Sequence, residues 1–293
     1  MKITGFGEIL WDDFPDGKRL GGAPLNLLVG LQSLGADTAI VSRIGNDADG
    51  REILRQVGLR KVASHLIQTD MSQATGLVKV MLADDGNASY DIVFPCAWDF
   101  IRAEDEAVRR VAESDAFVFG SLAGRHDVSR RALDCLLEHA RFKIFDVNLR
   151  HPHYDYDRIL ALLKQCDLVK LNDAELYELA AIYGSPYHSL QQNAAYLADY
   201  AGCSRICATM AEHGAMYYDN GRFHFHCGYR VRVADTVGAG DSFLAGFTYK
   251  LLNRSSPAEI LDFACALGAL TASRPGANPA ISLQEIEEFM NPA

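Results

Sequence analysis

Short apolar runs alternate along the chain with longer stretches in which apolar residues recur every three to four positions. The short runs predict buried strands over residues 2–9, 38–45, 115–122, 143–149, 167–172 and 205–210. The longer stretches predict helices over 24–34, 47–58, 103–113, 127–141, 155–164, 173–183, 189–202, 240–252, 257–273 and 282–290. Near-continuous apolar strands separated by helices are typical of a parallel sheet with helices on both faces.

Two segments interrupt this alternation. Residues 12–22 contain the turn sequence PDGK between short flanks, and residues 74–94 have the strand, DDGN turn and strand pattern of a hairpin. We therefore expect a three-layer αβα sandwich with a mostly parallel central sheet. A small β-sheet is expected beside it, formed by about residues 12–22 and 74–98, either as a lid or as an edge extension of the main sheet. The whole chain, 1–293, is predicted to be one domain.

Composition and charge narrow the class of protein. The formal net charge of −10 argues against binding to nucleic acid or to anionic membranes. No apolar run approaches the ~20 residues of a transmembrane helix, and the start, MKITGFGEIL, matches a strand better than a signal peptide. The seven cysteines are scattered without a CxxC or zinc spacing, which favours free thiols. We expect a cytoplasmic protein.

The segment ADTVGAGDSFLAGF, residues 234–247, carries the strongest chemical signal. Gly238, Ala239 and Gly240 leave backbone amides uncovered just before a helix expected to begin near Asp241. Uncovered amides and the positive end of a helix together form a cradle for a phosphate or a developing negative charge. Helix capping by Asp is the simpler alternative, but capping needs no bare turn. The pattern therefore favours an anion site that contains a carboxylate.

Two long motifs resemble those of the PfkB (ribokinase-like) sugar kinases. DTVGAGDSFLAGF is similar to the C-terminal signature of that family, and GGAPLNLLVGLQSLGADTAIVSRIG, residues 21–45, is similar to its N-terminal signature. The resemblance covers essentially the whole chain. It implies that Asp241 is the catalytic base and that the backbone of Gly238, Ala239 and Gly240 forms the anion hole. It also implies ATP and Mg²⁺ as the phosphoryl donor and its metal ion.

The resemblance further implies a set of sugar ligands. GEILWDD brings Asp12 to the end of the first strand, where similar kinases bind sugar hydroxyls, as they do at the positions of Gly22 and Asn26. DVNLR, residues 146–150, adds Asn148 and Arg150 at the end of another strand. Carboxylate and amide side chains between them both accept and donate hydrogen bonds, which suits a polyol.

The nucleotide side is implied by further stretches. KLNDAE, residues 170–175, has the N-x-x-E spacing, so that Asn172 and Glu175 either order Mg²⁺ through its waters or form a capping box; both roles can hold together. RPGANPA, residues 274–280, resembles the family's closing loop near the nucleotide and a monovalent-cation site, which would bind K⁺. The other positions implied to contact the nucleotide are Thr209, Gly214, Asp235, Thr236, Gly238 and Gly240.

Several stretches are most similar to bacterial fructokinase-type members, namely GEILWDDFPDGKRLGGAP, PCAWDFI, GSLAGR and RPGANPAI. They suggest phosphorylation of D-fructose to fructose 6-phosphate. Ribose, 2-keto-3-deoxygluconate and nucleosides remain alternative acceptors, and Tyr90, Phe94 and Trp98 are candidates for stacking on a nucleoside. A non-catalytic sugar sensor on the same scaffold is a further alternative. A dinucleotide enzyme is disfavoured because GFGEIL lacks the third glycine. Relatives often pair their lids, so we expect a homodimer.

Overall fold

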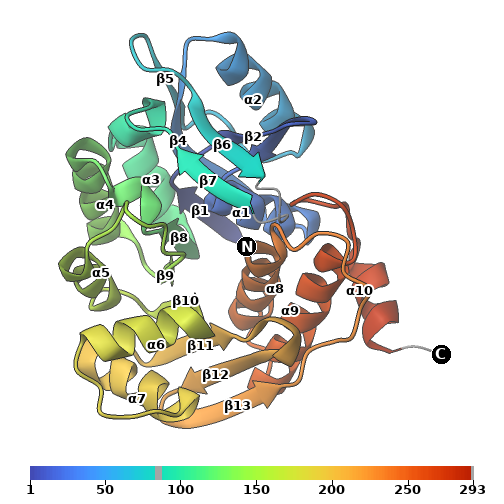
Figure 1. Cartoon of the computed structure of the whole chain (residues 1–293). Coiled ribbons are helices and arrows are strands. Elements are labelled where there is room, and N and C mark those ends of the chain that lie inside the picture. The colour runs from blue at the N-terminus through green and yellow to red at the C-terminus, as the bar shows by residue number, and fades with distance from the viewer. Residues whose placement is uncertain (83–87, 292–293) are drawn as a thin grey trace.

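The computed structural model describes residues 1–82 and 88–291. Within them, a nine-stranded sheet has the order β13-β12-β11-β10-β9-β8-β1-β4-β5 (Figure 1). The strands from β11 to β5 in this order pair in parallel, which confirms the predicted mostly parallel sheet. Their bounds are β1 Lys2–Phe6, β4 Asp37–Gly45, β5 Ile67–Asp70, β8 Ala116–Gly120, β9 Lys143–Asp146, β10 Leu168–Asn172 and β11 Arg205–Thr209.

Helices cover both faces of this sheet, and apolar side chains form a separate core under each layer. One layer contains α3 (Asp105–Glu113), α4 (Asp127–His139), α5 (Tyr156–Leu163), α6 (Asp173–Ile182) and α7 (Leu190–Ala201). The other contains α1 (Ala23–Ser33), α2 (Ala48–Leu59), α8 (Ala239–Leu252), α9 (Pro257–Ala272) and α10 (Leu283–Met290). Every predicted helix is present, with ends shifted by at most two residues. The three-layer αβα sandwich is thereby confirmed.

Most helices begin at a residue whose side chain caps the first turn. Asp47, Asn172 and Ser256, for example, each accept a hydrogen bond from a backbone N–H three residues later. Helix α8 differs, because its N-cap is Gly238, which has no side chain with which to cap it. The turn before α8 therefore lacks a capping side chain, as predicted.

The sequence prediction missed two strands at one edge of the main sheet. β12 (Ala215–Asp219) and β13 (Arg222–His226) continue the sheet beyond β11 as an antiparallel hairpin. Its turn is Asn220-Gly221, with φ of 48° and 86°, which is a strong hairpin signal between alternating residues. The short strand β5 was also missed. Predicted strand 143–149 ends earlier, at Asp146.

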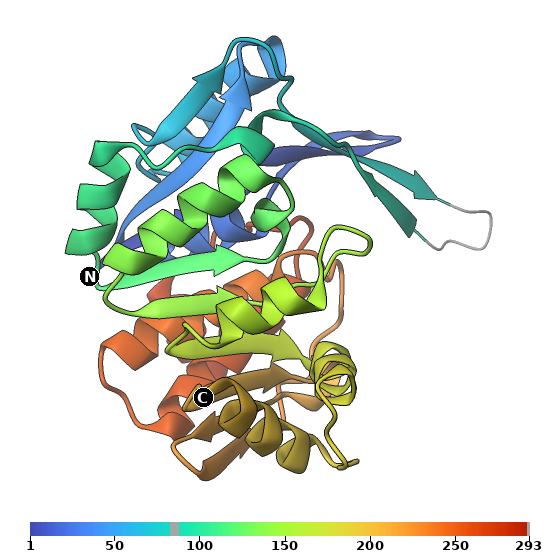
Figure 2. The same cartoon turned by 90° about the vertical axis from the view of Figure 1, so that its left-hand side faces the viewer.

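The predicted small sheet is present, with the strand order β3-β2-β6-β7. Its strands are β2 (Leu10–Phe14), β3 (Gly17–Gly21), β6 (Gly76–Leu82) and β7 (Ala88–Ile92). Figure 2 shows that it projects beyond the edge where the parallel strands end, so it is not an edge extension of the main sheet. The prediction extended it too far, since residues 97–100 form a short 3₁₀ helix. The predicted DDGN turn, 84–87, lies outside the described residues.

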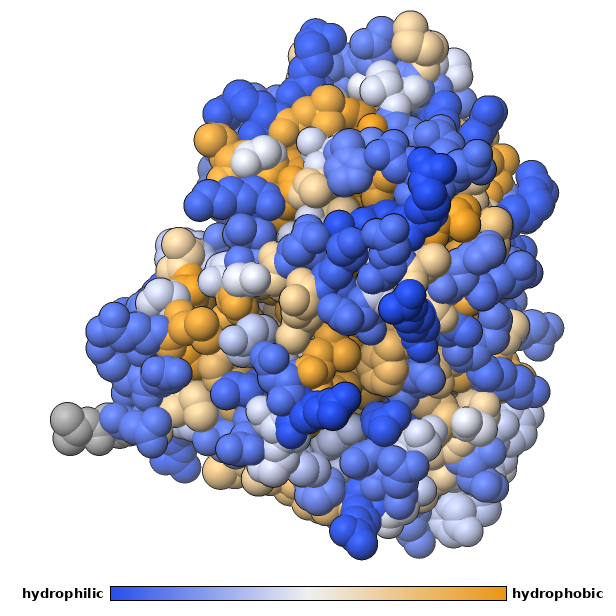
Figure 3. Space-filling view, turned by 180° about the vertical axis from the view of Figure 1, so that it is seen from behind, coloured by the Kyte–Doolittle hydropathy of each residue, from blue (hydrophilic) through white to orange (hydrophobic). Residues whose placement is uncertain are grey.

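The surface agrees with a chain whose apolar residues are mostly internal. Figure 3 shows the rear face as predominantly polar, with apolar residues in separate patches. No helix in the described residues has both the length and the hydropathy needed to cross a membrane. All seven cysteines are free thiols, as expected.

Candidate active site

A cavity of about 420 Å³, lined by both polar and apolar residues, lies where the main sheet meets the small sheet. The predicted site residues that line it are Asp12, Gly22, Asn26, Asn148, Arg150, Thr236, Gly238, Gly240 and Asp241. Glu8 and Lys170 line it as well, and the sequence analysis selected neither. The fold therefore gathers at one edge residues that stand as far apart in the chain as Asn26 and Asp241. The predicted residues outside this lining are Asn172, Glu175, Thr209, Gly214, Asp235 and Ala239.

The turn before α8 has the geometry of an anion cradle. Gly238 adopts φ 76°, a conformation that favours glycine, and a Cβ there would collide with the carbonyl of Ala277. Within the described part of the chain, the amides of Gly240 and Asp241 have no hydrogen-bond acceptor. Free amides at the positive end of a helix attract phosphate or carboxylate oxygens. The turn can therefore hold a phosphate group.

The Asp241 carboxylate is oriented by a chain of two amides. Asn26 Nδ2 donates to Asp241 Oδ2 at 2.8 Å, and Asn278 Nδ2 donates to Asn26 Oδ1 at 2.7 Å. Burial raises the pKa of Asp241 to about 6, and the Asp146 carboxylate adds to the rise, whereas the hydrogen bond from Asn26 opposes it. A carboxylate with this pKa is ionised at neutral pH and is a better base than an ordinary Asp.

We expect a kinase reaction at this site to lose rate below pH 6. If Asp241 must be ionised, a pKa of about 6 leaves roughly a tenth of the molecules active at pH 5. The value of kcat/KM should therefore fall about tenfold between the neutral plateau and pH 5. Steady-state rates across pH 4.5–8 measure this, with circular dichroism to verify that the fold persists. A midpoint at pH 4 would contradict the raised pKa.

The opposite wall of the cavity carries Asp12, whose pKa burial raises to about 6 against the opposing charges of Arg150 and Arg19. Two glycines at the end of β3 allow close contacts at this wall. Any side chain at Gly21 would collide with the Asp12 carboxylate, and one at Gly22, where φ is 115°, would collide with the Glu8 carbonyl. The glycine pair therefore allows β3 to approach β2 and β1 closely.

Glu8 is a buried carboxyl that the sequence analysis missed. It follows β1, is 3% exposed, and its Oε2 has no hydrogen-bond partner within residues 1–82 and 88–291. Burial raises the pKa of Glu8 to about 7; the charge of Arg150 opposes the rise and that of Asp241 adds to it. The available signal was an acidic residue at the end of an otherwise apolar strand.

We expect Glu8→Gln to change how stability depends on pH. The folded pKa of about 7 lies above the ordinary 4.5, so Glu8 favours the folded state below pH 4.5 and loses that contribution as pH rises through 7. The free energy of unfolding of the variant minus that of wild type should therefore be on the order of 3 kcal/mol higher at pH 8 than at pH 4.5. Urea unfolding at both pH values measures this, with exposed Glu104→Gln as the control. Equal differences at the two pH values would contradict it.

Asn172 and Glu175 form the predicted capping box at the start of α6. Asn172 Oδ1 accepts from the Glu175 amide, and Glu175 Oε2 accepts from the Asn172 amide, both at 2.8 Å. Glu175 Oε1 also accepts from the amide of Leu149 at 2.8 Å, which holds the segment carrying Asn148 and Arg150. The capping interpretation is confirmed. The proposed role in ordering Mg²⁺ remains a prediction, and within the described residues no three His, Cys, Asp or Glu side chains form a metal cluster.

The predicted nucleotide-side residues lie in two segments, and Thr236 in one of them lines the cavity. Asp235 accepts hydrogen bonds from the amides of Val237 at 3.0 Å and Gly276 at 3.1 Å, and so ties the loop at 274–280 to the anion turn. Thr209 ends β11, and a short 3₁₀ helix leads from it to Gly214. Ala211 adopts φ 48° there, a backbone conformation that favours glycine.

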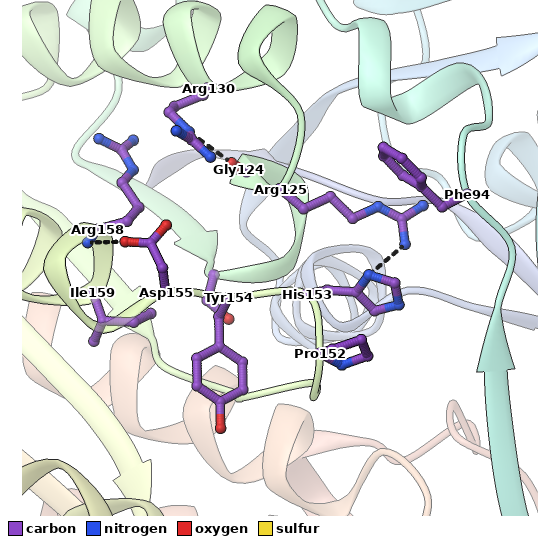
Figure 4. Close-up of a pocket in the computed structure, with 11 residues that line it drawn as sticks. Phe94, Gly124, Arg125, Arg130, Pro152, His153, Tyr154, Asp155, Arg158 and Ile159 are labelled. Carbon is purple, nitrogen blue, oxygen red and sulfur yellow. Dashed lines mark hydrogen bonds between the residues drawn. The ribbon is translucent and has the colours of Figure 1, made fainter. Parts of the chain in front are cut away.

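A second pocket, of about 240 Å³, shares no residue with the cavity (Figure 4). Arg125 lines this pocket, and its guanidinium forms a bidentate ion pair with the buried Asp99 carboxylate, at 2.7 and 2.9 Å. Its guanidinium also lies over the rings of Phe94 and Trp98 and approaches His153 Nδ1 at 3.5 Å. Because Asp99 neutralises the guanidinium, we interpret this pocket as a structural junction. Neither Phe94 nor Trp98, which is fully buried, lines the active-site cavity.

Together, the buried carboxylate of Asp241 beside free helix amides and the cavity that it lines fit the transfer of a phosphoryl group to a hydroxyl group. The chain matches the family described as pfkB family carbohydrate kinase over residues 15–283. It belongs to this family, as its motifs predicted, and is a carbohydrate kinase with the ribokinase-like fold.

Relatives with several substrates share this architecture. Fructokinase-2 of Solanum lycopersicum is 26% identical over 309 residues, covering 95% of this chain and 92% of that protein. The structure of a fructokinase with bound ATP from Xylella fastidiosa has a TM-score of 0.86 at 24% identity, covering 99% of this chain and 98% of that one. A 2-dehydro-3-deoxygluconokinase from Thermotoga maritima has a TM-score of 0.84 at 20% identity, with the same coverage.

Proposed function

We propose that this kinase transfers the γ-phosphoryl group of ATP to the primary hydroxyl of D-fructose and produces fructose 6-phosphate. The observation that carries the proposal is Asp241, an oriented base beside free helix amides, lining the same cavity as Asp12. The tomato and Xylella fastidiosa relatives, both named fructokinases, support fructose as the acceptor.

In the proposed reaction, the sugar binds between the main sheet and the small sheet. Asp12 accepts hydrogen bonds from its hydroxyls, and Asn148 both accepts and donates them, with Gly22, Asn26 and Arg150 lining the same cavity. Asp241 accepts the proton of the attacking hydroxyl. The free amides of Gly240 and Asp241 stabilise the negative charge of the phosphoryl group as it moves. The Ala239 amide, predicted to belong to the anion hole, instead donates to the Thr236 carbonyl at 3.3 Å.

The residues present fit a bound nucleotide. The free amides of Gly240 and Asp241 suit phosphate oxygens, and the 209–214 and 235–236 segments flank them as the family resemblance implies. Mg²⁺ would neutralise phosphate charge. Its contact with Glu175 would run through water, as the family resemblance implies, while both Glu175 oxygens accept a backbone hydrogen bond that fixes the carboxylate. A K⁺ ion at the 274–280 loop is part of the proposal.

A sugar acid such as 2-keto-3-deoxygluconate is the second candidate. Arg150 is exposed at the cavity. The one hydrogen bond of its side chain in the described structure is to the carbonyl of Leu149, so its guanidinium is free to pair with a carboxylate. Ribose remains an alternative acceptor, because binding it would need no residue beyond those named for fructose. A nucleoside has less support, because Phe94 and Trp98 lie away from the cavity. A sensor without catalysis is disfavoured by the intact base and turn.

The decisive experiment measures ADP release with Mg-ATP and fructose, ribose, 2-keto-3-deoxygluconate, glucose or adenosine. Turnover on fructose, well above that on the others, supports the proposal. Preferred turnover on another acceptor keeps the kinase and rejects fructose. Binding of a sugar without any turnover would favour the sensor.

The proposal includes a cytoplasmic homodimer. ATP is available in the cytoplasm, and the free thiols suit a reducing compartment. β3 and β7 are the edge strands of the small sheet in the described chain, and an unpaired edge can pair with a second copy. Sedimentation velocity at working concentration tests this, and a monomer would reject it.

A further inference from the structure

Lys170 is a charged residue in the middle of the buried strand β10. It is 7% exposed, and Val169 and Leu171 on either side are fully buried. Its Nζ donates to Asp146 Oδ1 at 3.0 Å, directly across on β9. Burying two charges is costly even when they are paired, and an apolar pair of similar size is often as stable. The pair therefore needs an explanation beyond folding.

The Lys170 ammonium lies against the first turn of α8. A Cβ built on Gly240 would be 3.4 Å from Lys170 Nζ. The helix N-terminus already carries a positive partial charge, and the ammonium adds to the positive potential at this point. Two positive groups facing one space favour an anion between them.

Lys170 also has hydrogen-bond donors to spare. An ammonium has three N–H groups, and Asp146 is its one acceptor among the residues that the structure describes. The side chain lines the same cavity as Asp241 and Arg150. Its remaining donors are therefore available to an oxygen-rich ligand in that cavity.

Carboxylates from three elements keep Lys170 charged. Burial lowers the pKa of Lys170, but Asp146 on β9, Glu175 on α6 and Asp241 on α8 outweigh this effect and raise it above its ordinary value. Lys170 thus stays an ammonium at every working pH, and proton transfer remains with Asp241.

We propose that Lys170 is a catalytic residue that binds the phosphoryl group during its transfer. The proposal rests on the kinase reaction above. The sugar oxygen bonds to the γ-phosphorus while the bond from that phosphorus to the β,γ-bridging oxygen breaks. The hydroxyl proton moves to Asp241, and ADP leaves. Lys170 keeps its proton and donates hydrogen bonds to a non-bridging phosphoryl oxygen, opposite the amides of Gly240 and Asp241.

The first test compares Lys170→Met with the double variant Asp146→Asn/Lys170→Met. The single variant leaves the Asp146 charge buried and unpaired, whereas the double variant removes both charges and protects the fold. Both should lose about 100-fold in kcat, with the KM for the sugar little changed. Lys143→Met, at the opposite end of β9, is the control and should keep full activity. A double variant with wild-type kcat would overturn the proposal.

The second test does not depend on which sugar is the acceptor. Calorimetry measures binding of ADP alone and of ADP with aluminium fluoride and Mg²⁺, which mimics the phosphoryl group in transit. Loss of Lys170 should weaken the second complex about 100-fold and leave the first unchanged. Equal affinities of wild type and double variant for the fluoride complex would overturn the role of Lys170. Absence of fructose turnover by the wild type would reject only the acceptor proposed above.

The pH profile tests whether the charge of Lys170 acts on Asp241, the residue that accepts the proton in the proposed reaction. The charge of Lys170 opposes the rise in the pKa of Asp241, so Lys170→Met should move the acidic limb of kcat above pH 6. Glu8, Asp12 and Arg150 are the other ionisable side chains that line the cavity, and they are unchanged in the variant. An unmoved limb would contradict a Lys170 charge that acts at the reacting centre.

Discussion

Asp241→Asn is expected to lower kcat by about 10²–10⁴-fold while sugar binding stays nearly unchanged. Asparagine has the same size and keeps an oxygen that can accept the hydrogen bond now donated by Asn26 at 2.8 Å. It cannot accept a proton from the sugar hydroxyl. The substitution therefore removes the base and preserves the shape of the cavity.

ADP release at saturating sugar and Mg-ATP measures this loss, and calorimetry with the sugar measures binding. Asp105→Asn is a matched control, because Asp105 also lies in the first turn of a helix but is exposed on α3. It should retain the wild-type rate. Turnover of Asp241→Asn near the wild-type rate would show that another group accepts the proton.

Features encoded by neighbouring residues were predictable from the sequence. The bare turn at Gly238 and the capping box of Asn172 and Glu175 each depend on a few consecutive positions, and both are present. The Asn220-Gly221 hairpin is equally local, but it was missed because its strands, AMYYD and RFHFH, are not continuous apolar runs. The mostly parallel pairing of the main sheet followed from the alternation of strands and helices.

Contacts between distant segments were not predictable in this way. Asn278 and Asn26 are 252 positions apart, and their hydrogen bond orients the Asn26 amide that donates to Asp241. Glu8 lies in the predicted strand 2–9, just after β1, and Lys170 lies within β10; in both apolar stretches a single charge looks like a minor interruption of the pattern. Only the fold shows that both side chains line the cavity.

Gly238→Ala is expected to lower kcat by about 10²–10³-fold, the effect of losing donors to a developing negative charge. The new Cβ would collide with the carbonyl of Ala277, so either the turn or the loop at 274–280 must move. Movement of the turn misaligns the free amides. Movement of the loop displaces Asn278 and, through Asn26, the base Asp241.

Gly202→Ala separates this effect from backbone strain. Gly202 has φ 69°, close to the 76° of Gly238, but ends α7, and a Cβ there meets no atom within 4 Å. Both variants carry the same strain of about 1–2 kcal/mol, so Gly202→Ala should be less stable with an unchanged kcat. Thermal unfolding and ADP release distinguish the two. A Gly238→Ala enzyme with wild-type kcat would mean that the turn does not act on the phosphoryl group, because its collision cannot be relieved without moving the amides or the base.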